Sequence, residues 1–480
     1  MYMKQKLVRV KRWICILFFA IGGIVVAQVE DLPKDSLSLK KEYVSKESAK
    51  KAKSKKILEE IKKHVEFYGN VRVYYFYDNR AMVSSSNGFV AKGPMDENMG
   101  YFGEDLNAES ASNLAAMSTR MGLNVKGPRV LGGVSSAKVE FDFAGFSTNN
   151  FLIRLRQAYM KFDWLDKKEG THALTLGQTW HPMAVDAQPT VLSMAAGAPF
   201  NPLNRSPQLQ YKYGNKSGFH LQAAALFQYQ YQSIAPAVKD GISARAYNIQ
   251  YNMIPECYLG IGYQNNGFNI TASADFVSIR PRPRASVFVG TEDVVVGVDA
   301  NGNNVTTTKN VYEERKVSDR FDGFNYSLVL NYDKNDFSFK AKTIFGEQTT
   351  HLNMLGGYGV IDEFADNTWK YQPIRMSASW IDFSYGKKFK GELFLGYSKN
   401  LGAEKDFIDV KNKMWAKDSK NIDQMIRIMP VISYNLKHFI FGLEYELDMI
   451  NYGELQANGS VKGDHWVLGH RLLALVRYNF

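Results

Sequence analysis

The chain has few cysteines and no long apolar segment in its main body. Only two cysteines occur in 480 residues, which excludes a disulfide-stapled scaffold. Beyond residue 30 there is no run of about 18 apolar residues, so a bundle of membrane-spanning helices is excluded. Hydrophobic residues make up 45% of the chain, with 27 tyrosines and 30 phenylalanines, and this excludes global disorder. The remaining classes are one large folded domain or two to three smaller ones.

The net charge of +11 is concentrated at the N-terminus. Residues 1–27 contribute +5, and residues 28–64, with 11 lysines and 7 acidic residues, contribute +4. Residues 65–480 therefore carry only +2. A nucleic-acid-binding body would concentrate lysine and arginine on one face, so this balance argues against a nucleic-acid partner.

The first 64 residues divide into an export signal and a basic arm. A basic stretch ends at Arg12, an apolar run extends to Val26, and Ala27 is a suitable cleavage position. This pattern predicts a signal peptide at 1–27 and a periplasmic, partly helical arm at 28–64. Apolar residues at helical spacing from Ile57 to Val65 cover less than two heptads. A coiled coil and a solvated tether therefore both remain open for the arm.

From Val65 onward the apolar period changes from 3.6 to 2. Residues 151–159, 219–229, 324–332, 439–449 and 472–480 alternate between apolar and polar side chains, as amphipathic strands do. We count about sixteen such strands, an even number as bacterial barrels have. They are predicted to begin near residues 65, 117, 134, 150, 171, 206, 217, 254, 267, 322, 336, 374, 388, 424, 437 and 468.

A soluble sandwich and a membrane barrel both use such strands, and the connections distinguish them. Alternate connections are short and rich in Gly, Asn, Asp or Lys, at 127–134, 164–170, 214–217, 264–267, 333–336, 385–388 and 435–438. The others are long, at 81–116, 181–205, 231–253, 281–321, 348–373, 399–423 and 450–467, and only 147–149 is short. A soluble sandwich does not require its short and long connections to alternate along the chain. The prediction is an all-β fold: a transmembrane antiparallel β-barrel spanning 65–480 in the outer membrane, surrounded by outer-membrane lipid.

The end of the chain supports a barrel. The last strand is amphipathic and ends with Tyr478 and a terminal Phe480. This resembles the C-terminal signal of outer-membrane proteins, which the barrel assembly machinery reads. We predict that Tyr478 and Phe480 act in assembly.

Four segments carry a family resemblance: SSAKVEFDFAGF (135–146), LRQAYMKFDW (155–164), LTLGQTWHPM (174–183) and GAPFNPLNRSPQLQY (197–211). They resemble the DcaP-like outer-membrane porins. The resemblance implies a homotrimer of sixteen-stranded barrels, each with an N-terminal periplasmic coiled coil. It also implies passive uptake of small, often anionic solutes.

If the apolar face of each strand meets lipid, the opposite face lines the lumen. Arg154 and Arg156 then point the same way, about 7 Å apart. Each guanidinium can hold a carboxylate through two parallel hydrogen bonds. The alternative is cross-strand ion pairing that stiffens the wall, and Arg477 near a rim is expected to contribute little. The predicted pore-lining and selectivity residues are Arg72, Arg120, Lys138, Arg154, Arg156, Asp186, Arg205 and Arg427.

The long connection 181–205 is unusually apolar for an exposed loop, and four prolines constrain it. We predict that it folds into the barrel and narrows it, with Asp186 facing Arg154 and Arg156. The alternative is packing against a neighbouring subunit. The predicted constriction residues are His181, Met183, Met194 and Phe200.

Enzymatic functions have little support. No histidine pair has zinc-ligand spacing, and no cofactor motif occurs. His465, His470 and Asp464 form the one candidate for a hydrolase at the barrel rim. A surface receptor or adhesin is the other alternative, because the long loops 281–321 and 348–423 could bind partners. The sequence favours a passive channel over both.

Overall fold

The computed structural model describes residues 55, 59–147, 150–166, 170–236, 251–298, 304–417 and 420–480. The predicted signal peptide 1–27 and most of the predicted arm 28–64 lie outside these residues. Within the described residues, no helix is both long enough and apolar enough to cross a membrane. The first strand begins at Val65, where the sequence pattern changes period.

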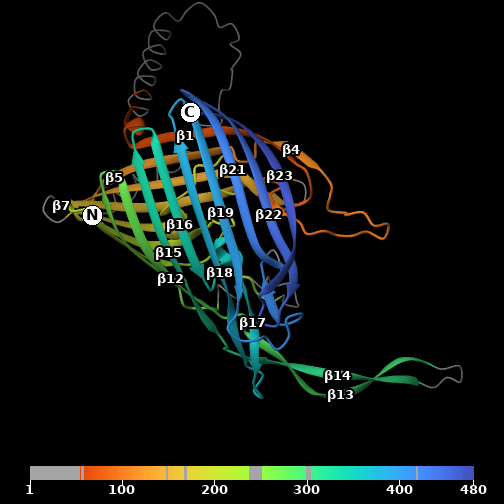
Figure 1. Cartoon of the computed structure of the whole chain (residues 1–480). Coiled ribbons are helices and arrows are strands. Elements are labelled where there is room, and N and C mark those ends of the chain that lie inside the picture. Colours follow the sequence, from red (N-terminus) through yellow and green to blue (C-terminus); the bar gives the residue numbers. More distant parts are fainter. Residues whose placement is uncertain are drawn as a thin grey trace, which may run out of the picture. The chain divides into compact units, whose positions relative to one another are not determined.

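Sixteen of the described strands form one closed antiparallel barrel, which confirms the predicted fold (Figure 1). Neighbours in the chain pair with each other, and the first strand closes the barrel by pairing with the last, with Val71 opposite Tyr478. The barrel strands are β1 (Val65–Asp78), β5 (Arg120–Val130), β6 (Gly133–Ser147), β7 (Asn150–Asp166), β8 (Gly170–Trp180), β9 (Arg205–Gly214), β10 (Phe219–Leu226), β11 (Glu256–Asn265), β12 (Phe268–Ile279), β15 (Phe321–Lys334), β16 (Phe337–Gly346), β18 (Trp369–Tyr385), β19 (Phe389–Gly402), β21 (Ile422–Leu436), β22 (Phe439–Leu455) and β23 (Val461–Asn479).

One end of the barrel carries tight turns, as predicted. The β11–β12 connection turns through Asn266 and Gly267, with φ of 48° and 85°. Two successive positive φ values suit Asn-Gly, whose backbone twist matches that of paired strands. The turns after β15 and β21 likewise contain a residue with positive φ, Asn335 or Lys437. These short connections hold neighbouring strands in register.

The other end carries the long connections, and several of them contain strand that was not predicted. Segment 281–321 forms a separate two-stranded sheet of β13 (Arg284–Val298) and β14 (Asn304–Lys316). β22 and β23 extend into predicted loop 450–467, to Leu455 and from Val461. Valine and threonine recur in β13 and β14 and favour strand there, because they pack well on a pleated surface. Shorter elements at this end are β2 (Met82–Ser85), β3 (Val90–Pro94), β4 (Ala111–Ala115), η1 (Thr350–Leu352), β17 (Gly357–Glu363) and β20 (Met414–Ala416).

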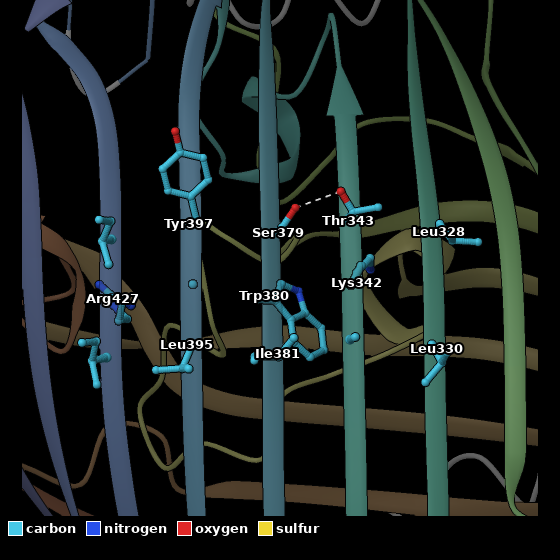
Figure 2. Close-up of a pocket in the computed structure, with 14 residues that line it drawn as sticks. Leu328, Leu330, Lys342, Thr343, Ser379, Trp380, Ile381, Leu395, Tyr397 and Arg427 are labelled. Carbon is cyan, nitrogen blue, oxygen red and sulfur yellow. Dashed lines mark hydrogen bonds between the residues drawn. The ribbon is translucent and has the colours of Figure 1, made fainter.

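The barrel strands have one apolar outer face and one mostly polar inner face. On β22, Phe439, Leu443 and Tyr445 are 41%, 48% and 40% exposed, whereas Glu444 and Asp448 are buried. Figure 2 shows the outer face over β15, β18 and β19, where Leu330, Ile381 and Leu395 line an apolar groove. The hydroxyls of Thr343 and Ser379 bond to each other there, 2.8 Å apart, as polar groups facing lipid must.

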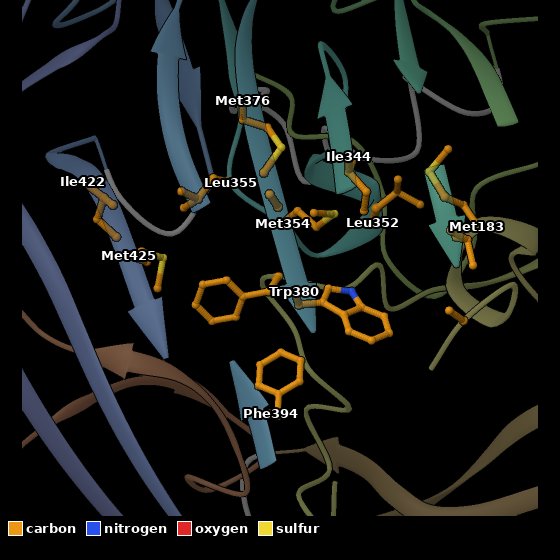
Figure 3. Close-up of a cluster of buried hydrophobic side chains, with 14 of the residues drawn as sticks. Met183, Ile344, Leu352, Met354, Leu355, Met376, Trp380, Phe394, Ile422 and Met425 are labelled. Carbon is orange, nitrogen blue, oxygen red and sulfur yellow. The ribbon is translucent and has the colours of Figure 1, made fainter. Parts of the chain in front are cut away.

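Part of the inner face is apolar, which is unusual for a barrel lumen. Trp380 of β18, Phe394 of β19 and Met425 of β21 belong to one buried cluster (Figure 3). Met183 and Phe200, from the connection between β8 and β9, pack in the same cluster. The apolar patch therefore supports an inward-folded segment on one side of the lumen.

Candidate pore constriction

The connection between β8 and β9, residues 181–204, crosses the lumen and is bonded to the opposite wall. The Thr190 hydroxyl donates to Asp382 on β18 at 2.7 Å. The backbone N–H of Leu192 donates to Glu444 on β22 at 2.6 Å. Both carboxylates are buried on inward-facing strand positions. We call residues 181–204 the inward loop.

The C-terminal half of the inward loop is fixed by an aromatic ring and a guanidinium. Phe200 packs against Phe394, with ring centroids 6.2 Å apart. A Cβ at Gly396 would lie 2.7 Å from the Phe200 ring, so glycine there leaves the space that the ring occupies. Arg427 donates to the carbonyl of Ala198 at 3.1 Å. The barrel wall at β19 and β21 therefore fixes the C-terminal half of the inward loop.

The N-terminal half of the inward loop includes the short helix α3 (Pro182–Val185) and a buried ion pair. Lys342 Nζ of β16 lies 2.6 Å from Asp186 Oδ1 and also donates to the carbonyl of Met183. Asp186 is thus bound to the barrel wall at β16. It does not line the cavity where Arg154 and Arg156 lie.

On the other side of the inward loop from β16, β19 and β21 lies a cavity of about 310 Å³, and its lining is strongly basic. The loop contributes Gln188, Pro189, Val191 and Met194, among others. The barrel wall contributes guanidiniums from five strands, β1, β5, β7, β9 and β23. These are Arg72, Arg120, Arg154, Arg156, Arg205 and Arg477.

Two carboxylates on β6 neutralise part of this charge. Arg154 donates to both oxygens of Asp142, at 3.0 and 2.8 Å. Arg156 bridges Asp142 at 2.6 Å and Glu140 at 2.8 Å. Arg120 Nε lies 3.8 Å from Glu140. Arg154 and Arg156 thus line the cavity and at the same time form the cross-strand ion pairs of the alternative interpretation.

The other three arginines have no carboxylate partner among the described residues. Arg205 donates from Nε to Gln230 at 2.7 Å and lies over the indole of Trp180, 4.7 Å from its centroid. Its Nη1, and Nε of both Arg72 and Arg477, have no hydrogen-bond partner in the described structure. Six arginines against two carboxylates leave a surplus of four positive charges around one cavity.

Other predicted residues lie away from this cavity. Lys138 Nζ sits over the Tyr68 ring, 5.1 Å from its centroid. Arg427 is fully buried and pairs with Asp448 at 2.6 Å, on the wall that holds the loop. His181 at the start of the inward loop bonds Glu256 instead of lining the cavity. Of the predicted constriction residues, Met194 lines the cavity, and Met183 and Phe200 are buried where the loop meets the wall.

Sequence reasoning missed two residues that shape the cavity, Trp180 and Gln230, which hold the Arg205 side chain. It expected little from Arg477 near a rim, whereas Arg477 contributes a sixth guanidinium to the cavity lining. The alternation of the last strand already placed Arg477 inward. Its proximity to Arg72, its partner across β1 and β23, depends on barrel closure, and the register could not be read from the sequence.

The lining of the cavity has the chemistry to attract and hydrogen-bond anions. Guanidiniums stay charged at any physiological pH and present paired N–H donors that match carboxylate or phosphate oxygens. Partial exclusion of water by the inward loop strengthens each charge–charge interaction relative to bulk solvent. A multivalent cation passing here would meet four uncompensated positive charges.

The candidate hydrolase trio is not assembled as a nucleophilic site. His465 Nε2 lies 2.7 Å from Asp96, and its Nδ1 bonds Asp464. His470 instead bonds the Tyr445 hydroxyl at 2.7 Å. Both ring nitrogens of His465 bond carboxylates, so among the described residues no serine hydroxyl is bonded to this ring for activation.

The predicted assembly residues lie at the seam where the barrel closes. The backbone N–H and C=O of Phe480 bond those of Gly69, each at 3.0 Å. The Phe480 ring stacks on Phe67, with centroids 5.7 Å apart, and Tyr478 packs on Phe439 at 4.9 Å. The last residues therefore complete the pairing of the first and last strands.

Comparison with known proteins supports the fold. No protein-family model matches the chain, and no curated protein matches it in sequence. The crystal structure of the outer membrane channel DcaP of Acinetobacter baumannii is similar at a TM-score of 0.58 and 15% identity, over 87% of this chain and 97% of that one. OmpT of Vibrio cholerae has a TM-score of 0.47 and 13% identity, over 87% of this chain and 97% of its own. An anion-selective porin from Comamonas acidovorans has a TM-score of 0.46 and 12% identity, over 87% of this chain and 99% of its own. The predicted resemblance to DcaP-like porins is confirmed at the level of the fold.

Proposed function

We propose that this chain is a passive outer-membrane porin that admits small anionic solutes, above all carboxylates, through a constricted, water-filled pore. The observation that carries the proposal is the cavity between the inward loop and an arginine-rich wall. The body of the protein has a net charge of only +2, and charges are screened within about 8 Å at physiological salt. Selectivity must therefore come from the local surplus at the narrow point.

We also propose that the chain assembles as a homotrimer embedded in outer-membrane lipid, as its resemblance to the DcaP-like porins implies. The long-loop end faces the outside, and the N-terminal arm lies in the periplasm. Outward-facing aromatic and aliphatic side chains on all sides of the barrel support a lipid environment. Insertion depends on the barrel assembly machinery, through the closing strand.

The test is a planar bilayer recording on the purified mature protein. A porin gives stepwise, ohmic conductance increments, and liposomes that contain it swell faster in a monocarboxylate than in an equally sized cationic solute. Absence of conductance from folded, heat-modifiable protein would contradict the proposal. Equal swelling rates would contradict the anionic preference and leave the channel function standing.

A surface receptor is the second candidate, and the β13–β14 sheet favours it. These strands pair only with each other in the described structure, and Val294, Val295 and Val296 are 36%, 50% and 61% exposed. Exposed valines on an unshared ribbon suit contact with another molecule. Deletion of 284–316 should leave conductance intact if the ribbon serves binding, and should change it if the ribbon belongs to the pore.

A further inference from the structure

Two histidines and two carboxylates meet in a buried cluster at the base of the inward loop. His181 follows β8, Glu256 begins β11, Asp275 lies in β12, and His351 lies in η1. One nitrogen or oxygen from each residue lies within 4.8 Å of the others. All four side chains are excluded from solvent. We propose that this cluster binds one divalent transition-metal ion of the manganese-to-zinc series.

The charge of the cluster calls for a cation. No lysine or arginine in the described chain pairs with Glu256 or Asp275, and the nearby Lys342 is engaged by Asp186. With both carboxylates ionised and both imidazoles neutral, the cluster would carry two unbalanced negative charges, which is costly in a dry site. One divalent ion balances them and leaves both imidazoles neutral.

The unused atoms of the cluster support a ligand at this position. Oε2 of Glu256 and Oδ1 of Asp275 are buried without a hydrogen-bond donor. Nε2 of both His181 and His351 is directed to the same Glu256 oxygen, at 2.6 and 3.0 Å. Two nitrogens and at least two carboxylate oxygens thus converge on one point.

The donor set selects the class of metal. Imidazole nitrogen suits zinc, nickel, cobalt and iron, whereas calcium and magnesium prefer oxygen ligands alone. A supporting contact is present, because Asn325 donates to the second oxygen of Asp275 at 3.0 Å and fixes its orientation.

Metal binding would replace three hydrogen bonds of the cluster, because Nε2 of His181 and Nε2 of His351 both bond Glu256 and would become metal ligands. Met183 N–H donates to Nδ1 of His181 at 3.2 Å, which puts the proton of the neutral ring on Nε2. Coordination by Nε2 moves that proton to Nδ1 and breaks this bond. This backbone hydrogen bond and the two histidine–Glu256 hydrogen bonds are lost, and the metal–ligand bonds take their place.

The consequence of the site is structural. It joins the first residue of the inward loop to β11, to β12 and to the η1 segment. A bound ion would therefore hold the base of the loop in place without changing the charge of the arginine cavity, where none of the four residues lies.

The experiment measures metal in untagged mature protein, purified from cells grown with added zinc and dialysed against metal-free buffer. The ion must enter while the barrel folds, because the site is closed to solvent. We expect about one zinc per chain by mass spectrometry of the digested protein. Protein produced with cobalt should show the visible absorption of a nitrogen- and oxygen-ligated Co²⁺ ion.

Variants locate the site. Glu256→Gln and His351→Gln should each lose the bound metal, and Asn325→Ala should weaken binding by about 10–100-fold. The matched control is His220→Gln, because His220 of β10 bonds Thr271 outside the cluster. It should keep the full zinc content. Wild-type protein with no zinc and no cobalt spectrum would overturn the proposal, as would folded Glu256→Gln that retains the metal.

Discussion

The guanidinium of Arg205 lies over the indole of Trp180, 4.7 Å from the ring centroid, and no carboxylate in the described part of the chain pairs with it. Its Nε donates to Gln230, and its Nη1 has no partner there. The ring and the amide hold this charge in position without neutralising it. Arg205 therefore presents a full positive charge to the cavity, unlike Arg154 and Arg156.

Replacing Arg205 with Gln should shift selectivity toward cations. The change removes one of four uncompensated charges and no ion pair, so folding should be little affected. The measurement is the zero-current potential in a gradient of potassium chloride. Arg375→Gln is the control, because Arg375 pairs with Glu404 and does not line the cavity. Equal shifts of the zero-current potential in both variants would contradict the prediction, because they would show that an arginine need not line the cavity to affect selectivity.

Replacing both Arg154 and Arg156 with Ala should have a larger effect than Arg205→Gln. Two positive charges are lost, and Asp142 and Glu140 lose their closest partners. The surplus of four charges falls to two, and the released carboxylates attract cations. We expect a stronger cation shift in the zero-current potential and weaker block by dicarboxylates. An unchanged potential with folded protein would mean that these side chains do not control the ion path.

Gly396→Ala should loosen the inward loop and raise single-channel conductance. The added Cβ would lie 2.7 Å from the Phe200 ring, which must move away from Phe394. Overpacking of this kind costs about 1–3 kcal/mol. Gly391→Ala on the same strand is the control, because a Cβ there meets nothing within 4 Å. Matching conductance and current noise in the two variants would place the loop outside the constriction.

Deletion of Phe480 should reduce the amount of folded, heat-modifiable barrel in the membrane. The deletion removes two backbone hydrogen bonds to Gly69 and the ring contact with Phe67. Each hydrogen bond contributes about 0.5–1.5 kcal/mol, and both lie where the barrel closes. Phe480→Tyr keeps the bonds and a ring, so it should assemble normally. A deletion variant that folds at the wild-type level would argue against a role in assembly.

The strands could be predicted because a barrel repeats one simple pattern. Each strand alternates with period two, and the turn residues mark every second connection. The predicted starts near 150, 267 and 336 lie within one residue of Asn150, Phe268 and Phe337. Strands within the long loops were harder to predict. β13 and β14 pair only with each other in the described structure, so no regular spacing in the sequence marks where these two strands begin and end.

The site was only partly predictable because it depends on register. Alternation turned Arg154 and Arg156 inward, but which carboxylates face them follows from β6 pairing with β7. Asp186 was expected opposite these arginines, whereas Lys342 binds it on the other wall. In the histidine cluster, His181 and His351 lie 75 and 95 positions from Glu256, so no local motif marks the cluster.

The most direct test of the account is the zero-current potential of the wild-type channel in a gradient of potassium chloride at neutral pH. If the arginine surplus controls the narrow point, chloride crosses more readily than potassium and the dilute side becomes negative. Raising the salt concentration on both sides should reduce this preference, because screening shortens the reach of the charges. A dilute side that becomes positive would contradict the central claim.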